Sequence, residues 1–214
     1  MSRIFRVFLS STFKDWTIER EHLRHHVFPR LTTWVEDESR NRGISARFLP
    51  VDLRWGVSDE EAQNNRAVEV CLDEIRRCQD ISPKPNFLAF LGQRYGWRPV
   101  PPTIPSAHWQ KLVKLRVIKE GDLFNKCYEE DLNAVPSERV LKKIDGKQLD
   151  RLRKYIDTHY KKYKSEWELV FPEREDRAFL LGSVTEQEIV RGAMLATDAQ
   201  QHAHVFSRNI SMKE

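Results

Sequence analysis

The segment RIFRVFLSST, residues 3–12, decides the fold of this chain, because a nearly unbroken apolar run ends there at three hydroxyl side chains. A run of this kind is typical of a strand buried in a parallel sheet. Ser11 and Thr12 would end the strand and cap a helix, and Asp15 has the spacing of a capping box. Apolar residues then recur at helical spacing as far as Gly43, the expected C-cap of that helix.

Two further strand-like runs follow. Residues 44–53 and the run FLAFL at 87–91 are both apolar, and residues 67–78 between them place apolar side chains at helical spacing. Strands that alternate with helices predict an α/β fold with a parallel sheet, because each helix carries the chain back to start the next strand in the same direction.

Residues 99–182 interrupt this alternation. Prolines begin the region, and one long amphipathic helix is expected over residues 148–171. The alternation resumes with a helix that Ser183 or Thr185 would cap, followed by a short strand at 203–207.

The sequence therefore predicts a single domain over residues 1–214. Its core would comprise residues 1–98 and 183–214, with a doubly wound parallel sheet of about four to five strands. Residues 99–182 would form a mostly helical insertion between the third strand and the helix that follows it.

Composition excludes several classes of protein. With 40% hydrophobic residues the chain is too apolar to be disordered, yet no run approaches the roughly 20 apolar residues that cross a bilayer. The odd cysteine count (3) argues against a disulfide framework, and the first residues lack the long apolar region of a signal peptide. We expect a cytoplasmic protein without membrane contact.

Residues 139–164 hold ten Lys and Arg against three Asp. Such a stretch is compatible with a nucleic-acid or membrane-surface patch. A solvated helix face is the commoner explanation, because basic residues interleaved with an apolar stripe are ordinary on helices. The stretch brings no base-stacking platform, so a nucleic-acid partner is not expected.

Ligands of open parallel sheets bind beyond the carboxyl ends of the strands. Applied to this chain, that rule collects hydroxyls, guanidinium groups, aromatic rings and a carboxylate, a mixture that suits a nucleotide. The candidate binding residues are Ser10, Ser11, Thr12, Arg54, Trp55, Arg94 and Tyr95, with Asp52 and Trp97 at the same edge.

Glu188 has two interpretations. Thr185 and Glu188 have the spacing of a capping box, in which the carboxylate would bond to the Thr185 backbone and take no part in chemistry. Alternatively the carboxylate faces the ribose C1′ of a bound nucleotide, where it would stabilise or attack an oxocarbenium-like centre. Spacing alone favours the cap.

Several catalytic motifs are absent from the sequence. It contains no phosphate-binding loop of P-loop ATPases, no Gly-x-Gly-x-x-Gly and no Gly-x-Ser-x-Gly elbow. His and Cys residues do not occur at metal-ligand spacing, so we expect neither a metal nor a resident cofactor.

Short motifs spread over residues 6–208 resemble a TIR-like family found at the N-termini of NACHT and other STAND ATPases. Many members of that family carry WD repeats, and the telomerase-associated protein and nephrocystin are relatives. The motifs are RVFLSSTFKD at 6–15, ERE at 19–21, HHVFP at 25–29, VDLRWGV at 51–57, GQRYGW at 92–97, NAVP at 133–136 and SVTEQE at 183–188.

The resemblance implies a flavodoxin-like, TIR-type fold and a role as the effector or signalling domain of a larger switch protein. TIR domains and the related deoxyribosyltransferases cleave an N-glycosidic bond with a helix glutamate, and the Thr-x-x-Glu pattern transfers that role to Glu188. TIR enzymes commonly carry a Trp a few residues before this glutamate, where the present chain has Val184 and Thr185.

Two functions from different classes remain open. The first is a TIR-like enzyme that hydrolyses NAD+ when it clusters, with Glu188 acting at the ribose and NAD+ as substrate. The second is a non-catalytic module that self-associates or recruits a partner together with the ATPase and repeat domains of its parent protein. A Glu188 side chain that faces open space within reach of Arg54 or Arg94 would favour the enzyme. A side chain folded back on Thr185, with Trp97 plugging the cleft, would favour the module.

Overall fold

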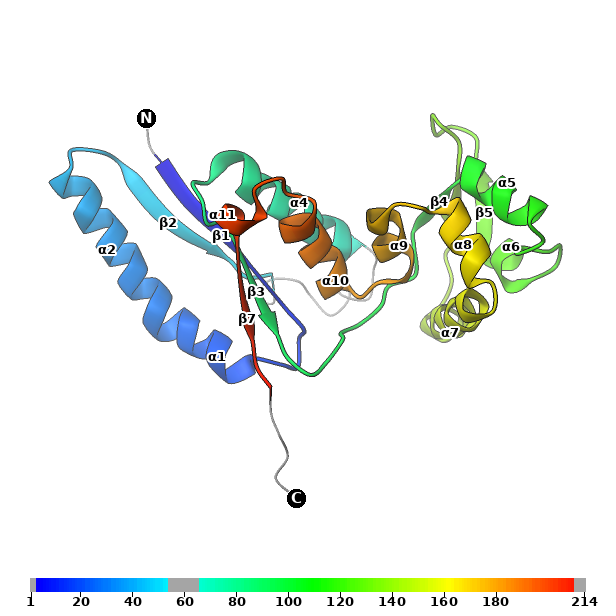
Figure 1. Cartoon of the computed structure of the whole chain (residues 1–214), viewed down its shortest axis with the longest axis horizontal. Coiled ribbons are helices and arrows are strands. Elements are labelled where there is room, and N and C mark those ends of the chain that lie inside the picture. Colours follow the sequence, from blue (N-terminus) through cyan, green and yellow to red (C-terminus); the bar gives the residue numbers. More distant parts are fainter. Residues whose placement is uncertain (1–2, 54–65, 210–214) are drawn as a thin grey trace, which may run out of the picture. The chain divides into compact units, whose positions relative to one another are not determined.

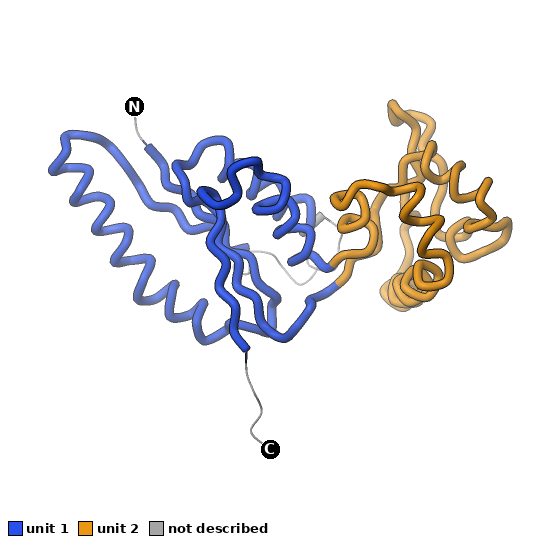
Figure 2. The backbone as a smooth tube through the Cα atoms, viewed as in Figure 1, with its two compact units in different colours: residues 1–97, 183–214 blue, residues 98–182 orange. Residues whose placement is uncertain are grey.

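The computed structural model describes residues 3–53 and 66–209. Backbone contacts divide the chain into two compact units, which are coloured separately in Figure 2. Unit 1 comprises residues 1–97 with 183–214, and unit 2 comprises residues 98–182. That division falls one residue from the boundary expected from the sequence, whereas a single domain over the whole chain stays a prediction.

The sheet of unit 1 confirms the predicted α/β class. Its strands are β1 (Arg3–Ser11), β2 (Ala46–Val51), β3 (Phe87–Leu91) and β7 (Ala203–Ser207). They are hydrogen-bonded in the order β2-β1-β3-β7, and every pair is parallel. β1 therefore lies in the interior of the sheet: residues 3–8 pair with β2, and its carboxyl end, residues 8–11, pairs with β3.

Helices cover both faces of this sheet, as a doubly wound fold requires (Figure 1). One face carries α1 (Thr17–His22), the π-helical turn η1 (Leu23–Val27) and α2 (Phe28–Asn41). The other carries α4 (Arg66–Ile81), α10 (Val184–Ile189), the π-helical turn η2 (Val190–Met194) and α11 (Ala199–His202).

The alternation of side chains along β1 builds these two layers. Phe8 packs with Phe87, Ile75 and Cys78 in one buried cluster. The next residue, Leu9, packs with a separate cluster on the opposite face. Because successive strand residues point to opposite faces, the continuous apolar run RIFRVFL supplies both cores at once.

The first helix begins later than the sequence predicts. Thr12 does not cap it: the Thr12 hydroxyl donates to Asp15 Oδ2 at 3.0 Å, and α1 starts at Thr17 after Trp16 in a left-handed conformation (φ 59°). The Asp15 carboxylate is used by the loop, so the expected capping box does not form. Trp34 belongs to the apolar residues that recur at helical spacing before Gly43, yet its side chain is 62% exposed rather than buried.

Unit 2 contains a sheet that the sequence did not suggest. β4 (Thr103–Pro105), β5 (Tyr128–Asp131) and β6 (Glu138–Leu141) form an antiparallel sheet in the order β4-β6-β5. Its helices are α5 (Ser106–Lys114), α6 (Leu123–Cys127), α7 (Gly146–Lys162), α8 (Lys164–Val170) and α9 (Arg174–Leu181). Strands of three or four residues are too short for a recognisable alternation of polar and apolar residues.

The long helix expected over residues 148–171 is two helices. The chain bends at Tyr163, whose φ of −121° and ψ of 38° end α7 and begin α8. The apolar stripe itself is correctly predicted, because Leu152, Ile156 and Trp167 all lie in the core of unit 2. Within residues 3–53 and 66–209 we find no helical segment with both the length and the hydropathy needed to cross a lipid bilayer.

Candidate functional site

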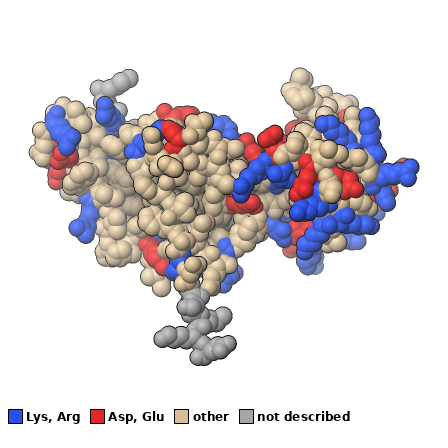
Figure 3. Space-filling view, in the orientation of Figure 1, with Lys and Arg blue, Asp and Glu red and all other residues tan. Residues whose placement is uncertain are grey.

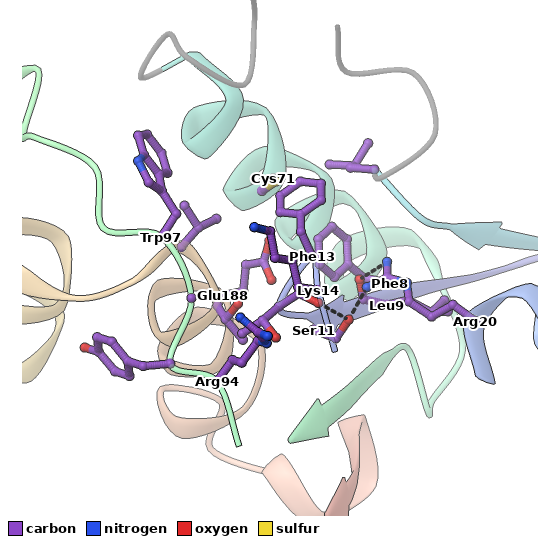
Figure 4. Close-up of a pocket in the computed structure, with 16 residues that line it drawn as sticks. Phe8, Leu9, Ser11, Phe13, Lys14, Arg20, Cys71, Arg94, Trp97 and Glu188 are labelled. Carbon is purple, nitrogen blue, oxygen red and sulfur yellow. Dashed lines mark hydrogen bonds between the residues drawn. The ribbon is translucent and has the colours of Figure 1, made fainter. Parts of the chain in front are cut away.

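A cavity of about 480 Å³ opens in unit 1 beyond the carboxyl ends of β1 and β3 (Figure 4). This is the edge where ligands bind in open parallel sheets. Its apolar walls include Phe8, Phe13, Leu53, Cys71, Trp97 and Val184. Its polar and charged lining comprises Ser11, Thr12, Lys14, Arg20, Arg94, Tyr95, Thr185 and Glu188.

Glu188 enters this cavity because α10 begins earlier than the capping-box interpretation requires. Ser183 is the N-cap, and its hydroxyl accepts from the Glu186 backbone N–H at 3.1 Å. Thr185 therefore lies inside the helix, and the predicted bond from Glu188 back to Thr185 is wrong. Glu188 instead accepts a hydrogen bond from the Ser10 hydroxyl at 2.5 Å and is 6% exposed.

The environment of Glu188 favours its neutral form more than water does. Burial raises the pKa of Glu188 to about 7, against hydrogen bonds from Ser10 and Cys71 and the positive charge of Arg20, all of which lower it. Burial, followed by the nearby Glu188 carboxylate, raises the pKa of the Cys71 thiol. Near neutral pH, Glu188 can therefore both accept and release a proton, as groups at catalytic sites often do.

A buried ion pair braces the tip of β1 from the opposite face. Arg20, which is 3% exposed, binds both carboxylate oxygens of Asp52, with its Nε 2.9 Å from Oδ2. It also donates to the Ser11 hydroxyl and, at 3.5 Å, to the Leu9 carbonyl, bonds that are drawn in Figure 4. Alternation along the strand thus turns Ser11 to Arg20 on α1 and Ser10 to Glu188 on α10.

The loop after β3 is held by hydrogen-bonding and ionic contacts between Arg94 and Asp15. The Arg94 backbone N–H donates to Asp15 Oδ2 at 2.9 Å, and the Arg94 Nε lies 3.7 Å from Oδ1. Gly92 makes this approach possible, because a Cβ there would lie 2.7 Å from Asp15 Oδ2. Gly96 adopts a φ of +94°, which lets the chain turn so that Trp97 follows at the cavity wall.

The predicted site residues have different outcomes. Ser11, Thr12, Arg94, Tyr95 and Glu188 border the same cavity, and Ser10 reaches it through Glu188. The hydroxyl of Tyr95 also donates to Glu186, which ties the β3 loop to α10. Arg54 and Trp55 lie outside the described residues.

Among the ionisable side chains of the cavity, sequence reasoning missed Lys14, Arg20 and Cys71. Lys14 follows the predicted strand by a few residues, so its place in the sequence could have revealed it. The sequence offers no such signal for Arg20, because its partners Asp52 and Ser11 come from other elements. Cys71 occupies an apolar position of α4 that is indistinguishable from an ordinary core position.

The positions of Glu188 and Trp97 distinguish the two functions. The Glu188 carboxylate does not fold back on Thr185, and Trp97 borders the cavity while leaving about 480 Å³ open. Arg94 borders the same cavity as Glu188. Among the residues that the structure describes, no group of three His, Cys, Asp or Glu could hold a metal ion.

The basic stretch in unit 2 forms no comparable site. Lys and Arg side chains gather on unit 2 in Figure 3, and that unit has 18 Lys and Arg against 14 Asp and Glu. Several of these basic side chains form ion pairs on the surface, such as Arg139 with Glu130 at 3.1 Å and Arg153 with Asp150 at 2.8 Å. This arrangement is typical of a solvated, charge-balanced surface.

Comparison with known proteins supplies the family context. A family model described as a domain of unknown function, DUF4062, matches residues 6–170. The NACHT domain- and WD repeat-containing protein 1 of Mus musculus is 29% identical over 199 residues, which cover 90% of this chain and 12% of the relative. The telomerase protein component 1 of Rattus norvegicus is 37% identical over 110 residues, which cover 50% of this chain and 4% of the relative.

A third relative is the NACHT and WD repeat domain-containing protein 2 of Homo sapiens, which is 28% identical over 142 residues, 65% of this chain and 8% of the relative. The chain thus spans at most 12% of the length of these relatives. No solved structure matches the chain.

Proposed function

This chain belongs to the DUF4062 family, and from that membership together with the Glu188 pocket we propose that it is a TIR-like effector domain that cleaves NAD+. One observation carries the proposal. A carboxyl group on a late helix is buried, hydrogen-bonded to Ser10 at 2.5 Å, and borders a cavity at the carboxyl edge of a parallel sheet.

The reaction is the hydrolysis of the bond between nicotinamide and the ribose C1′. As the bond breaks, nicotinamide leaves with both bonding electrons and C1′ develops oxocarbenium character, which the Glu188 carboxylate stabilises. Water adds to C1′ and loses one proton, so that NAD+ and water give nicotinamide, ADP-ribose and H⁺. Trp97, Phe13 and Phe8 provide apolar walls suited to a flat ring, and Glu188 provides the negative charge.

The residues around Glu188 support its role at the ribose C1′ because they offset the effect of burial on its pKa. Burial strengthens any electrostatic interaction that the carboxylate makes with a developing cation, but it also promotes protonation. Ser10, Cys71 and Arg20 lower the pKa of Glu188 and so keep the carboxylate accessible near neutral pH.

The names of the relatives support a place for the domain in a larger switch protein. Two of the three carry NACHT and WD repeat regions, and the aligned segment is a small part of each. In this setting the attached ATPase and repeat regions would cluster the domain, and clustering would switch on cleavage. Self-association and contact with those regions are the partnerships that we propose.

An NAD+ turnover assay on an artificially oligomerised chain tests the proposal. We expect nicotinamide release by the clustered protein and a loss of at least about 100-fold in the Glu188→Gln variant, because the carboxylate acts on the transition state. Glu69→Gln makes the same chemical change at an exposed position of α4 and should leave release intact. Release that stays at the buffer level despite clustering would refute the enzymatic proposal.

A second candidate, a non-catalytic association module, is favoured by an apolar groove in unit 1. Val27, Leu31 and Trp34 line a hollow of about 830 Å³ on η1 and α2, and Trp34 is 62% exposed. If this groove joins copies of the domain, Trp34→Glu should abolish concentration-dependent self-association in analytical ultracentrifugation. Unchanged sedimentation of this variant beside the unmodified chain would remove the candidate.

A further inference from the structure

Two cations from separate loops border the Glu188 pocket. Lys14 lies between β1 and α1, and Arg94 lies in the loop after β3. Figure 4 draws both residues among those that line the pocket with Glu188. Neither is paired with the Glu188 carboxylate, and Lys14 has no ion pair within residues 3–53 and 66–209. All three residues border the cavity of about 480 Å³, which is large enough to admit a ligand.

Contacts with Asp15 fix the position of Arg94. Its backbone N–H and its Nε both face the carboxylate of Asp15, at 2.9 and 3.7 Å. Asp15 is itself fixed by the Thr12 hydroxyl and closely covered by Gly92. These contacts engage the backbone N–H and the Nε of Arg94, and the Arg94 side chain is 60% exposed.

Asp15 compensates the charge of Arg94, whereas Lys14 forms no ion pair among the described residues. The Arg94 guanidinium and the Lys14 ammonium border one cavity, and these two groups are the side chains that bind phosphate most often. The inner wall of the same pocket is apolar and suits a ring.

We propose that Lys14 and Arg94 form an anion subsite that binds the diphosphate of a nucleotide while its ring and sugar occupy the pocket beside Glu188. The inference rests on the proposed function and names the residues that would bind the diphosphate of its substrate. Lys14 supplies a mobile point charge, and Arg94 supplies a fixed one held by Asp15.

Binding of ADP and of adenosine to the whole chain, measured by isothermal titration calorimetry, tests this subsite because the two probes differ only in the diphosphate. ADP should bind at least about tenfold more tightly than adenosine at low salt, and this advantage should shrink as salt is added. Lys14→Gln and Arg94→Gln should each weaken ADP binding by roughly five- to tenfold while adenosine binding stays unchanged. Lys14→Arg should retain the affinity for ADP.

Arg47→Gln is the matched control, since Arg47 is exposed on β2 and does not border the cavity. Equal affinity for ADP and adenosine, no ADP binding at millimolar concentration, or equal weakening by Arg47→Gln and Lys14→Gln would each overturn the subsite. The binding experiment tests the subsite independently of the hydrolysis of NAD+. Salt-sensitive ADP binding that depends on Lys14, without nicotinamide release by clustered protein, would keep the subsite and refute the proposed hydrolysis.

Discussion

Burial and the groups around Glu188 act in opposite directions on the pKa of its carboxyl group. Its pKa of about 7 in the folded chain lies above the ordinary value of 4.5. Between pH 4.5 and pH 7, Glu188 of the folded chain holds a proton that the unfolded chain has lost. The contribution of this carboxyl group to folding stability is therefore complete below pH 4.5 and is lost as the pH rises through 7. A functional carboxylate at this position therefore destabilises the fold at neutral pH.

The free energy of unfolding should depend less on pH in the Glu188→Gln variant than in the unmodified chain. From pH 5 to pH 8 the free energy of unfolding should fall more in the unmodified chain than in the variant, by on the order of 1–3 kcal/mol, because glutamine cannot ionise. Urea unfolding at both pH values measures the difference. Parallel pH dependences for the two proteins would show that Glu188 does not titrate as described.

Ser10 should tune the same equilibrium. Its hydroxyl donates to Glu188 at 2.5 Å and lowers the pKa of that carboxyl, so Ser10→Ala should move the midpoint of a pH profile of nicotinamide release to higher pH. The shift should reach roughly one pH unit, the effect of one charge-assisted hydrogen bond. Ser45→Ala, at an exposed position, is the control, and a midpoint unchanged in Ser10→Ala would contradict the role assigned to Ser10.

At the scale of elements, the pair Arg20–Asp52 connects α1 to the end of β2 and to the tip of β1. Arg20→Met should lower the free energy of unfolding by about 3–5 kcal/mol, because Asp52 would remain as a buried charge without its main partner. The double variant Arg20→Met with Asp52→Leu should recover much of the loss. Thermal unfolding of the single and double variants measures both effects.

The exposed pair Arg42–Glu38 provides the comparison for that experiment. Arg42→Met should cost less than about 1 kcal/mol, because solvent screens this pair. Similar costs for Arg20→Met and Arg42→Met would mean that the buried pair does not brace the strand tip.

Close packing between η2 and β3 offers a second test at this scale. A Cβ on Gly192 would lie 2.3 Å from a ring carbon of Phe87, so Gly192→Ala should destabilise the chain by roughly 1–3 kcal/mol through overpacking. Gly146→Ala, at the start of α7 with open space around it, should be neutral or slightly stabilising. Chemical denaturation separates the two, and an unaffected Gly192→Ala variant would contradict the packing.

These elements also show how far the sequence could predict the structure. Strands of unit 1 were recognisable because β1 and β3 are buried on both faces and read as continuous apolar runs. The parallel sheet then located the site at its carboxyl edge. Arg20 could not be foreseen, because its role depends on Asp52, which is distant along the chain and near only after folding. The true start of α10 could not be chosen between Ser183 and Thr185, since both residue types cap helices well.

At the scale of the whole molecule, each unit has a hydrophobic core of its own. Leu112, Phe124, Leu152 and Trp167 belong to the core of unit 2, whereas Phe8 and the sheet build separate clusters in unit 1. Residues 98–182 should therefore fold without the rest of the chain. The isolated fragment should show a cooperative thermal transition by circular dichroism, and a gradual, featureless melt would contradict two independent cores.

The proposed NAD+ cleavage depends on Glu188 acting as a carboxylate in the pocket at the carboxyl edge of the sheet. Its most direct test is nicotinamide release by the clustered chain measured from pH 5.5 to 8.5. We expect the rate of release to rise with pH, with a midpoint near 7, and no release at any pH in Glu188→Gln. Release that persists in Glu188→Gln, or an unmodified chain that releases no nicotinamide at any pH, would contradict it.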